Sequence, residues 1–338
     1  MNVIKKSTCT FTLILSFGIS AALCQTGYKV LKNHKIGSSG LWDYITIDSA
    51  AKRMYVSHGN QVNVLSTSNG DSVGVVLNTL GVHGIVINTA LSKGYTSNGM
   101  ANSISIFDLK TLKVLKEVPV GQNPDAIFYD DFSEKIITCN GNSNDLSVFD
   151  PLTEKVIATI PLGDKPETAV SDGKGKIFVN GEETSTLFVI DAKEFKKMHA
   201  YKINGGTAPS GLDIDRSTNR LFIGCGDSKT MVIMNPDNGK TIAKFPIGSS
   251  DGVVFDQNLK IAFASNGEGT ISVVKELSAN KFIALKSIVT ETGARTIALD
   301  KTTHHLFLPA AKTKPSTTGG WPIMIPGTFH VIEVGPSN

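Results

Sequence analysis

The sequence predicts an all-β fold, a seven-bladed β-propeller made of four-stranded antiparallel blades, with an N-terminal strand closing the last blade. One segment pattern recurs seven times along the 338 residues, at a spacing near 42. Each of the first six copies holds four short stretches with strand-like patterning, and no stretch of ten or more positions carries a 3.6-residue apolar stripe. A period of about 40 residues with four strands per repeat is the pattern of a propeller blade.

The repeat is clearest at the strand that opens each copy. These strands begin with "DYITID", "HGIVIN", "DAIFYD", "ETAVSD", "SGLDID", "DGVVFD" and "RTIALD". From Asp43 to Arg295 there are 252 residues in six steps of 40 to 44, which is a mean of 42. The narrow spread indicates a true repeat whose loops vary slightly in length.

The other three strands of a copy follow in order. The opening strand stops at an acid or amide turn such as Asp48, and the second strand follows a Lys or Arg with an apolar-aromatic pair such as Met54-Tyr55. The third alternates with a period of two, as in "ISIFD" and "LSVFD". The fourth ends in an apolar residue and glycine, as at Val120-Gly121.

The two ends of the chain are expected to share one blade. The seventh copy stops after its third strand, "FHVIEV", whereas "YKVLKNHKIG" near the N-terminus matches the fourth-strand pattern "KVLKEVPVG". We therefore predict that residues 28–36 form the outer strand of the last blade, which removes an open sheet edge. Residues 25–338 then form a single propeller domain.

Residues 1–24 have the pattern of a secretory signal peptide. Lys5 and Lys6 precede the apolar run "FTLILSFGISAAL", and small residues at its end suit cleavage, after either Ser20-Ala21-Ala22 or Ala22-Leu23-Cys24. Leu23 directly before Cys24 disfavours a lipoprotein signal, so lipid anchoring is the lesser alternative. The protein is predicted to be exported to a periplasmic or extracellular location, with no transmembrane segment in the mature chain.

The charge of the mature chain is close to balanced. The 33 basic residues lose two lysines with the signal, which leaves 31 against 30 acids and a net charge of +1. This balance gives no electrostatic reason to expect duplex nucleic acid or an anionic membrane as partner. Cys139 and Cys225 end strands of blades 3 and 5, too far apart for a disulfide, so both are expected as thiols in a monomer.

The second strands carry a recurring four-residue stretch at their ends. It reads Tyr55-Val56-Ser57-His58, Tyr95-Thr96-Ser97-Asn98 and Ile137-Thr138-Cys139-Asn140, and "FASN" over 263–266 is a fourth copy. In these stretches the chain resembles the YVTN-type, YncE-like seven-bladed propellers, whose repeat is WD40-like. The signature of that family is Tyr-Val-Thr-Asn at the end of the second strand, and blades 4 and 7 depart from it with "FVNG" and "FLPA". The resemblance implies an exported propeller and says little about function, because such families include ligand binders, nucleic-acid binders and cell-surface proteins.

A candidate binding site lies at one mouth of the central channel. Because the first two strands of a blade are antiparallel, the start of the first and the end of the second meet on one face. The predicted ligand-binding residues there are Asp43, His83, Asp125, Glu167, Asp251 and Arg295, with Asn98, Asn140 and Asn266 one layer further out. The alternative is that each residue caps a turn or bonds a neighbouring blade. The turns of the opposite face, including His304-His305, are expected to be solvated loops.

Two finer interpretations concern this mouth. Asp43, His58, His83 and Asp125 are candidate ligands of a divalent metal ion, held by imidazole and carboxylate. Arg295 is a candidate for binding a carboxylate or phosphate, with a salt bridge between blades as the alternative.

Blade 7 contains an insertion over residues 311–326, in the stretch "AKTKPSTTGGWPIMIPG" between its second and third strands. It leaves from the face of the polar mouth. We interpret it either as a long loop or as a partial lid that places Trp321 or Met324 over the mouth.

No catalytic residue can be assigned, because no Ser-His-Asp arrangement or phosphate-binding loop is present. The first hypothesis is a non-catalytic scaffold that binds a small molecule, protein or peptide at the mouth. The second is a metal-dependent hydrolase or lactonase at the same mouth, in which a metal-bound water is the nucleophile. A third, binding of single-stranded nucleic acid, is suggested only by the family resemblance.

Overall fold

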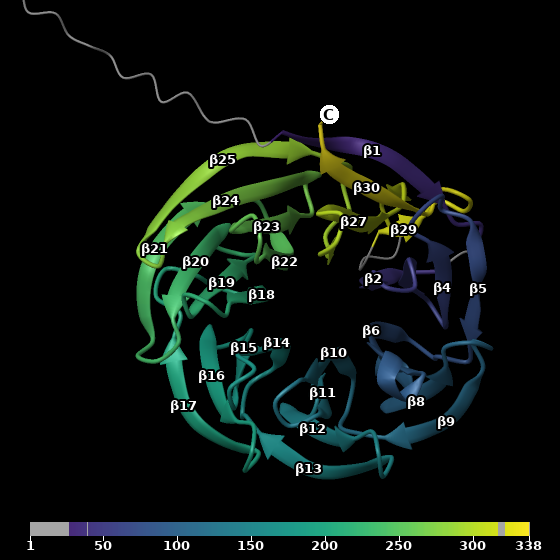
Figure 1. Cartoon of the computed structure of the whole chain (residues 1–338), viewed down its shortest axis with the longest axis horizontal. Helices are drawn as coiled ribbons and strands as arrows, with labels where there is room; N and C mark the ends of the chain where they lie inside the picture. The colour runs from purple at the N-terminus through teal and green to yellow at the C-terminus, as the bar shows by residue number, and fades with distance from the viewer. Residues whose placement is uncertain (1–26, 39, 317–321, 338) are drawn as a thin grey trace, which may run out of the picture.

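Seven four-stranded antiparallel sheets stand in a ring around a central channel in the computed structural model (Figure 1), which confirms the predicted fold class. The structure describes residues 27–38, 40–316 and 322–337, so the predicted signal peptide lies outside the described residues. Two single-turn 3-10 helices, η1 (Thr89–Leu91) and η2 (Gly99–Ala101), occur in blade 2. Within the described ranges, no helix is long and apolar enough to cross a membrane.

Blades 1 to 3 run from the innermost to the outermost strand in chain order. Blade 1 holds β2 (Trp42–Asp48), β3 (Arg53–His58), β4 (Gln61–Ser66) and β5 (Ser72–Leu77). Blade 2 holds β6 (Val82–Asn88), β7 (Lys93–Asn98), β8 (Ser103–Asp108) and β9 (Val114–Pro119). Blade 3 holds β10 (Pro124–Asp130), β11 (Lys135–Asn140), β12 (Asp145–Asp150) and β13 (Lys155–Pro161).

Blades 4 to 6 repeat the order. Blade 4 holds β14 (Pro166–Ser171), β15 (Lys176–Gly181), β16 (Thr186–Asp191) and β17 (Lys196–Lys202). Blade 5 holds β18 (Pro209–Asp215), β19 (Arg220–Cys225), β20 (Thr230–Asn235) and β21 (Lys240–Pro246). Blade 6 holds β22 (Ser250–Asp256), β23 (Ile261–Asn266), β24 (Thr270–Ser278) and β25 (Lys281–Val289).

Blade 7 is assembled from both ends of the described chain. Its strands are β26 (Ala298–Asp300), β27 (His305–Ala310), β30 (His330–Pro336) and β1 (Tyr28–Lys35), in that order from the channel outward. β1 pairs antiparallel with β30 from Tyr28↔Pro336 to Lys35↔His330. The predicted closure by the N-terminal strand is confirmed, and it pairs the exposed edge of β30.

Apolar clusters fill the spaces between neighbouring blades. Aromatic residues of the second strands recur in these clusters. The ring centroids of Tyr55 and Phe107 lie 6.1 Å apart between blades 1 and 2, and those of Tyr95 and Phe149 lie 5.8 Å apart between blades 2 and 3. The innermost strands approach so closely that some positions admit only glycine. A Cβ added to Gly211 would lie 2.5 Å from the backbone nitrogen of Val253 in the next blade.

Candidate functional site

The first strands of blades 1 to 6 share a β-bulge, and it falls at the predicted ring residues. The register between first and second strands shifts directly after Trp42, Val82, Pro124, Pro166, Pro209 and Ser250. The residues that follow these positions are Asp43, His83, Asp125, Glu167, Ser210 and Asp251. A bulge leaves one residue outside the regular alternation and re-aims its side chain, so this irregularity positions the polar ring at the mouth.

The serine of the recurring second-strand stretch ties the bulge down. Ser57 Oγ accepts a hydrogen bond from the backbone N–H of Asp43 at 3.0 Å and donates to the carbonyl of Tyr44 at 3.0 Å. In blade 2, Ser97 Oγ accepts from the Gly84 N–H at 2.8 Å and donates to the carbonyl of Asp125 in the next blade. The serine satisfies backbone groups that the bulge leaves unpaired, so its recurrence has a structural cause.

Five of the predicted ring residues form one charged network across the mouth. His83 Nδ1 lies 2.7 Å from Asp43 Oδ2 and 3.6 Å from Asp125 Oδ1. Arg295 Nη2 lies 3.5 Å from Asp43 Oδ1, and Arg295 Nη1 bonds Asp251. The network joins blades 3, 2, 1, 7 and 6 in that order. The salt bridge between blades that was the alternative for Arg295 is therefore present, with Asp43 and Asp251 as its partners.

Glu167 belongs to a neighbouring pair on the same mouth. Its Oε2 lies 3.3 Å from Lys165 Nζ, and this lysine also bonds Glu182. Glu167 is 8% exposed, and Oε2 has no hydrogen-bond partner beyond that ion pair. Asp125 Oδ1 is likewise buried without a hydrogen-bond donor. Two buried carboxylate oxygens at the mouth are thus incompletely paired.

Burial and mutual repulsion shift the acids of the mouth toward their protonated forms. Burial, reinforced by the charge of Asp43, raises the pKa of Asp125 to about 7. Burial and then the charge of Asp125 raise the pKa of Glu167 well above its usual value, and burial also raises that of Asp251. Tyr44 also lies at the mouth, and burial, followed by the charges of the nearby carboxylates, raises its pKa well above the usual value. The mouth therefore has more acidic groups than its cations neutralise.

The pKa values of two cationic groups of the mouth are also raised, which favours their charged forms. Burial lowers the pKa of His83, but the hydrogen bond to Asp43 and the charges of both aspartates outweigh burial, so its pKa is raised. Arg295 is also held charged, because Asp43 and Asp251 outweigh its burial and raise its pKa. A positive group is thus stabilised at this mouth.

Asp43, His83 and Asp125 present donor atoms that all lie within 4.8 Å of one another. The fourth predicted metal ligand, His58, is not in this group. Its Nδ1 bonds Ser38 Oγ at 2.7 Å, its Nε2 bonds the Gly40 carbonyl at 3.0 Å, and its ring stacks on Phe329 at 3.9 Å. Burial lowers the pKa of His58. The structure gives His58 a packing role in blade 1.

The three predicted amide ligands are buried inside their blades. Asn140 Nδ2 donates to Asp145 Oδ1 at 2.7 Å and to Ser147 Oγ at 2.9 Å, and Asn140 Oδ1 accepts from Thr138. Asn98 donates likewise to two serines of β8, and Asn266 to Thr270 and Ser272 of β24. All three are fully buried, and their amide groups bond the third strand of their own blade, so their role is structural.

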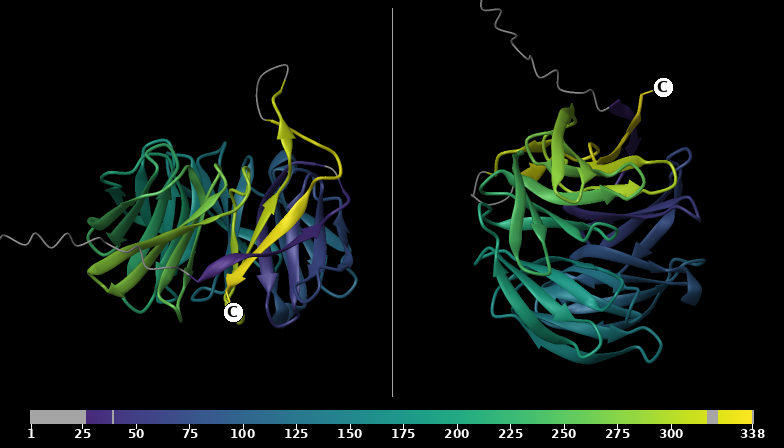
Figure 2. Two further views of the ribbon diagram at one scale, coloured as in Figure 1. Left: turned by 90° about the horizontal axis from the view of Figure 1, so that it is seen from above. Right: turned by 60° about the vertical axis from the view of Figure 1, so that its left-hand side comes forward.

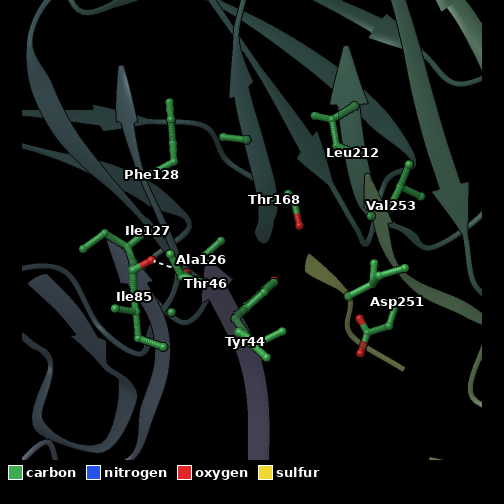
Figure 3. Close-up of a pocket in the computed structure, with 16 residues that line it drawn as sticks. Tyr44, Thr46, Ile85, Ala126, Ile127, Phe128, Thr168, Leu212, Asp251 and Val253 are labelled. Atoms are coloured by element: carbon green, nitrogen blue, oxygen red, sulfur yellow. Dashed lines mark hydrogen bonds between the residues drawn. The ribbon is translucent and has the colours of Figure 1, made fainter. Parts of the chain in front are cut away.

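Below the charged mouth the channel is apolar. A cavity of about 180 Å³ is lined by Tyr44, Ile85, Ile127, Leu212 and Val253, among others. Figure 3 shows side chains from several blades around this cavity, with the Asp251 carboxylate at one end and Thr46 bonded to the Ile85 carbonyl at 2.7 Å. A ligand at the mouth therefore meets charged groups first and aliphatic groups beneath them.

The insertion of blade 7 forms a short hairpin beside the mouth. β28 (Thr313–Lys314) pairs with β29 (Ile323–Met324), and the hairpin projects from the disc in Figure 2. Met324 packs against the apolar cluster that contains Trp42 and Phe329. Trp321 lies outside the described residues, so its predicted role in a lid stays a prediction.

The opposite face is more structured than expected. It is hollowed by a cavity of about 480 Å³, whose lining includes Asp131, Asp213, Arg216 and Lys301. Arg216 forms two bonds to the Asp131 carboxylate, at 2.6 and 2.9 Å. His304 Nδ1 lies 2.6 Å from Asp256 Oδ2 and His305 Nδ1 2.7 Å from Glu333 Oε1, so both histidines are paired where solvated side chains were expected.

Sequence reasoning missed Lys165 and Tyr44 at the mouth. Lys165 lies two positions before Glu167, and Tyr44 directly follows Asp43. The repeat register marked only one position per blade, whereas Lys165 lies just before β14 and Tyr44 lies within the bulge of β2. The prediction of two free thiols at Cys139 and Cys225 is confirmed.

Comparisons with known proteins bear on the fold. A structure of Kuenenia stuttgartiensis hydrazine synthase is similar at a TM-score of 0.70 and 14% identity, over 82% of this chain and 94% of that chain. A structure of U3-55K is similar at a TM-score of 0.72 and 10% identity, over 91% of this chain and 99% of that chain. No family model and no curated protein matches the chain. Likeness at such low identity establishes a β-propeller scaffold and nothing about its ligand.

Proposed function

We propose that the protein is a non-catalytic binding propeller whose polar mouth receives a positively charged group of a ligand. The observation that carries this proposal is the surplus of buried carboxylates, Asp43, Asp125, Glu167 and Asp251, over the cations beside them. Asp125 Oδ1 lacks a hydrogen-bond donor and Glu167 Oε2 has only the 3.3 Å ion pair with Lys165, so an ammonium or guanidinium group would supply donors to both. The apolar channel beneath suits the carbon chain of such a ligand.

Titration calorimetry with a matched pair of ligands that differ in head-group charge tests this proposal. Agmatine and Nα-acetylarginine amide are expected to bind, whereas Nα-acetylcitrulline amide, which is isosteric with the latter and uncharged, is not. The double variant Asp125→Asn/Glu167→Gln is expected to weaken binding at least tenfold. A matched control, Asp191→Asn/Glu194→Gln on the turn between β16 and β17, should leave it unchanged. Equal binding of the Nα-acetylated arginine and citrulline amides would contradict the proposal.

A second candidate function is metal-dependent hydrolysis at the same mouth. The convergence of Asp43, His83 and Asp125 favours it, because one imidazole and two carboxylates fit a divalent metal ion and leave positions for water. Four ligands of a tetrahedral ion lie about 3.3 Å apart at typical bond lengths. The distances of 2.7 and 3.6 Å from His83 to the two aspartates bracket that value.

Elemental analysis of protein purified without chelator or affinity metal tests this candidate. Stoichiometric metal that is lost in Asp43→Ala/His83→Ala, and kept in the outer-strand control His199→Ala, would support it and justify assays on lactones and esters. Metal-free protein that also takes up no zinc or manganese at micromolar concentration would eliminate it. A metal bound there would occupy Asp43 and Asp125, so a positive result would also argue against a ligand cation at these two carboxylates.

We also propose that the chain is a YVTN-type, YncE-like propeller exported through its N-terminal leader. The recurring second-strand stretches and the basic-apolar pattern of residues 1–24 support this. Expression of the full chain in a bacterial host with two membranes, followed by mass spectrometry of the periplasmic fraction, tests it. A mass lacking residues 1–24 is expected. Full-length chain retained in the cytoplasm would contradict export, and an acylated Cys24 would favour the lipid-anchored alternative.

A further inference from the structure

The face that carries the polar mouth also carries exposed apolar side chains. Leu41 is 59% exposed, Leu80 43% and Met100 72%, and all three lie in connections of blades 1 and 2 on that face. Ile323 and Ile325 of the blade 7 hairpin are 44% and 38% exposed. Single exposed apolar residues are ordinary, whereas a contiguous group beside a polar site marks an interaction surface.

Leu41, Leu80 and Met100 lie on neighbouring connections that are hydrogen-bonded to one another, and we call these three residues the apolar strip. The connection that holds Leu41 is bonded to the blade 1 turn, where the Gly59 N–H donates to the Leu41 carbonyl at 2.7 Å. That turn is bonded in turn to the connection that holds Leu80, since the Gly81 N–H donates to Asn60 Oδ1 at 3.0 Å.

The far end of the strip is fixed by the same kind of contact. The Gly99 N–H donates to the Gly81 carbonyl at 2.8 Å. Met100 lies directly on Gly81, where an added Cβ would come within 2.5 Å of Met100 Cγ. These hydrogen bonds fix the connections that carry the apolar strip relative to one another over blades 1 and 2.

The strip runs up to the charged mouth. A Cβ added to Gly99 would lie 2.7 Å from His83 Nε2, so Met100 is one residue away from contact with the ring. His83 in turn bonds Asp43 at 2.7 Å. Acidic groups that favour a cation and exposed apolar groups that favour burial therefore adjoin on one face.

We infer that this face docks a polypeptide segment of a partner protein, which inserts a Lys or Arg side chain into the mouth and lays apolar side chains on the apolar strip. This inference rests on the proposed function and names its partner. A small amine would fill the mouth and leave the strip in water, whereas a peptide covers both. An anionic lipid surface or a nucleic acid would place phosphates against four carboxylates, which opposes either occupant.

Three fluorescein-labelled pentapeptides separate the two contributions by fluorescence anisotropy on the full chain. The first has a central arginine between pairs of leucines, the second has the same arginine between pairs of serines, and the third has citrulline between pairs of leucines. The leucine-flanked arginine peptide is expected to bind at least tenfold more tightly than either of the others, because burial of even one leucine side chain is worth about a factor of ten.

Surface variants then assign the contributions to places. Leu80→Ser/Met100→Ser is expected to weaken the leucine-flanked arginine peptide at least fivefold and to leave the serine-flanked one unchanged. Leu152→Ser/Ile157→Ser removes equally exposed apolar residues from the outer edge of blade 3 and should change neither. All four positions are exposed, so folding is expected to be retained.

The possible results distinguish failure of the docking inference from failure of the proposed cation site. Equal affinity of the leucine- and serine-flanked arginine peptides, or equal effects of the two double variants, would overturn the docking inference while leaving the mouth as a cation site. Equal affinity of the arginine and citrulline peptides between leucines would overturn the proposed function and the inference with it. Protein that pairs with itself through the strip would show peptide-inhibited dimers in analytical ultracentrifugation, and that result also overturns the inference.

Discussion

His34 Nε2 and Glu333 Oε2 lie 2.8 Å apart, although 299 positions separate the two residues. His34 belongs to β1 and Glu333 to β30, and the second oxygen of Glu333 lies 2.7 Å from His305 Nδ1 on β27. One carboxylate therefore links three strands of the blade in which the chain closes on itself. His34 is 2% exposed, so this linkage is inside the blade.

The substitution Glu333→Gln is expected to weaken this closure. It removes the charge that both imidazoles bond, and loss of a buried charge-assisted hydrogen bond costs about 1–3 kcal/mol. Urea unfolding at pH 7.5 followed by circular dichroism would measure the loss. Glu194→Gln, at an exposed turn, is the control, and equal stability of the two variants would contradict a closing role.

The effect of Glu333 is expected to depend on pH. Burial raises its pKa, but the hydrogen bonds to His34 and His305 outweigh burial and lower it overall. A group whose pKa is lowered on folding stabilises the protein above its unfolded pKa, near 4.3 for Glu, and loses that contribution as the pH falls further. The stability difference between the wild type and Glu333→Gln should thus shrink below about pH 4.

Glu276 is expected to show the opposite dependence. It is 4% exposed, and burial and the nearby Asp215 raise its pKa to about 7. A raised carboxyl pKa means that stability falls as the pH rises from the unfolded value toward 7. Glu276→Gln, which resembles the protonated acid, should be more stable than the wild type by about 1–3 kcal/mol at pH 8. The gain should diminish toward pH 5.

Urea titrations at several pH values would test Glu276, with the exposed Glu183→Gln as control. A gain that is the same at pH 5 and pH 8 would show that Glu276 is not a buried acid of raised pKa. A loss of stability at pH 8 would show that its charge is favourably bonded.

Asn140→Ala is expected to destabilise the fold and to leave the mouth intact. The substitution removes three hydrogen bonds within blade 3 and leaves buried partners unpaired, at a cost of about 2–4 kcal/mol. Asn204→Ala, at an exposed position, is the control for stability. Calorimetry with agmatine should give an affinity within twofold of the wild type. An unaltered unfolding midpoint together with lost agmatine binding would instead make Asn140 a ligand contact.

Cys139 and Cys225 are expected to resist alkylation in the folded protein. Both are fully buried, and burial raises the pKa of Cys225 to about 12 and that of Cys139 well above its usual value. The reactive species is the thiolate. Peptide mapping after iodoacetamide treatment at pH 8 should find both unmodified, and both modified once urea is added. Modification of either in the native protein would contradict its burial.

The sequence was sufficient for the architecture because the repeat leaves the same signal seven times. Period-two alternation identified the third strands, and one missing fourth strand together with one surplus N-terminal strand identified the closure from Tyr28. The register of the repeat also located the ring from Asp43 to Arg295. Each of these inferences needs only local residue patterns and their spacing, and both can be read directly from the amino-acid sequence.

The tertiary structure determined which residues of the polar ring contact one another. A bulge depends on one unpaired residue between two strands, so no alternation pattern reveals that it aims Asp43, His83 and Asp125 at one point. Hydrogen bonds form only within a few tenths of an ångström of their ideal length, a precision that the sequence does not specify. In the folded protein His83 lies against Asp43, and His58 is enclosed beside Ser38 and Phe329. The sequence determined which residues ring the channel, and only folding decided which of them meet.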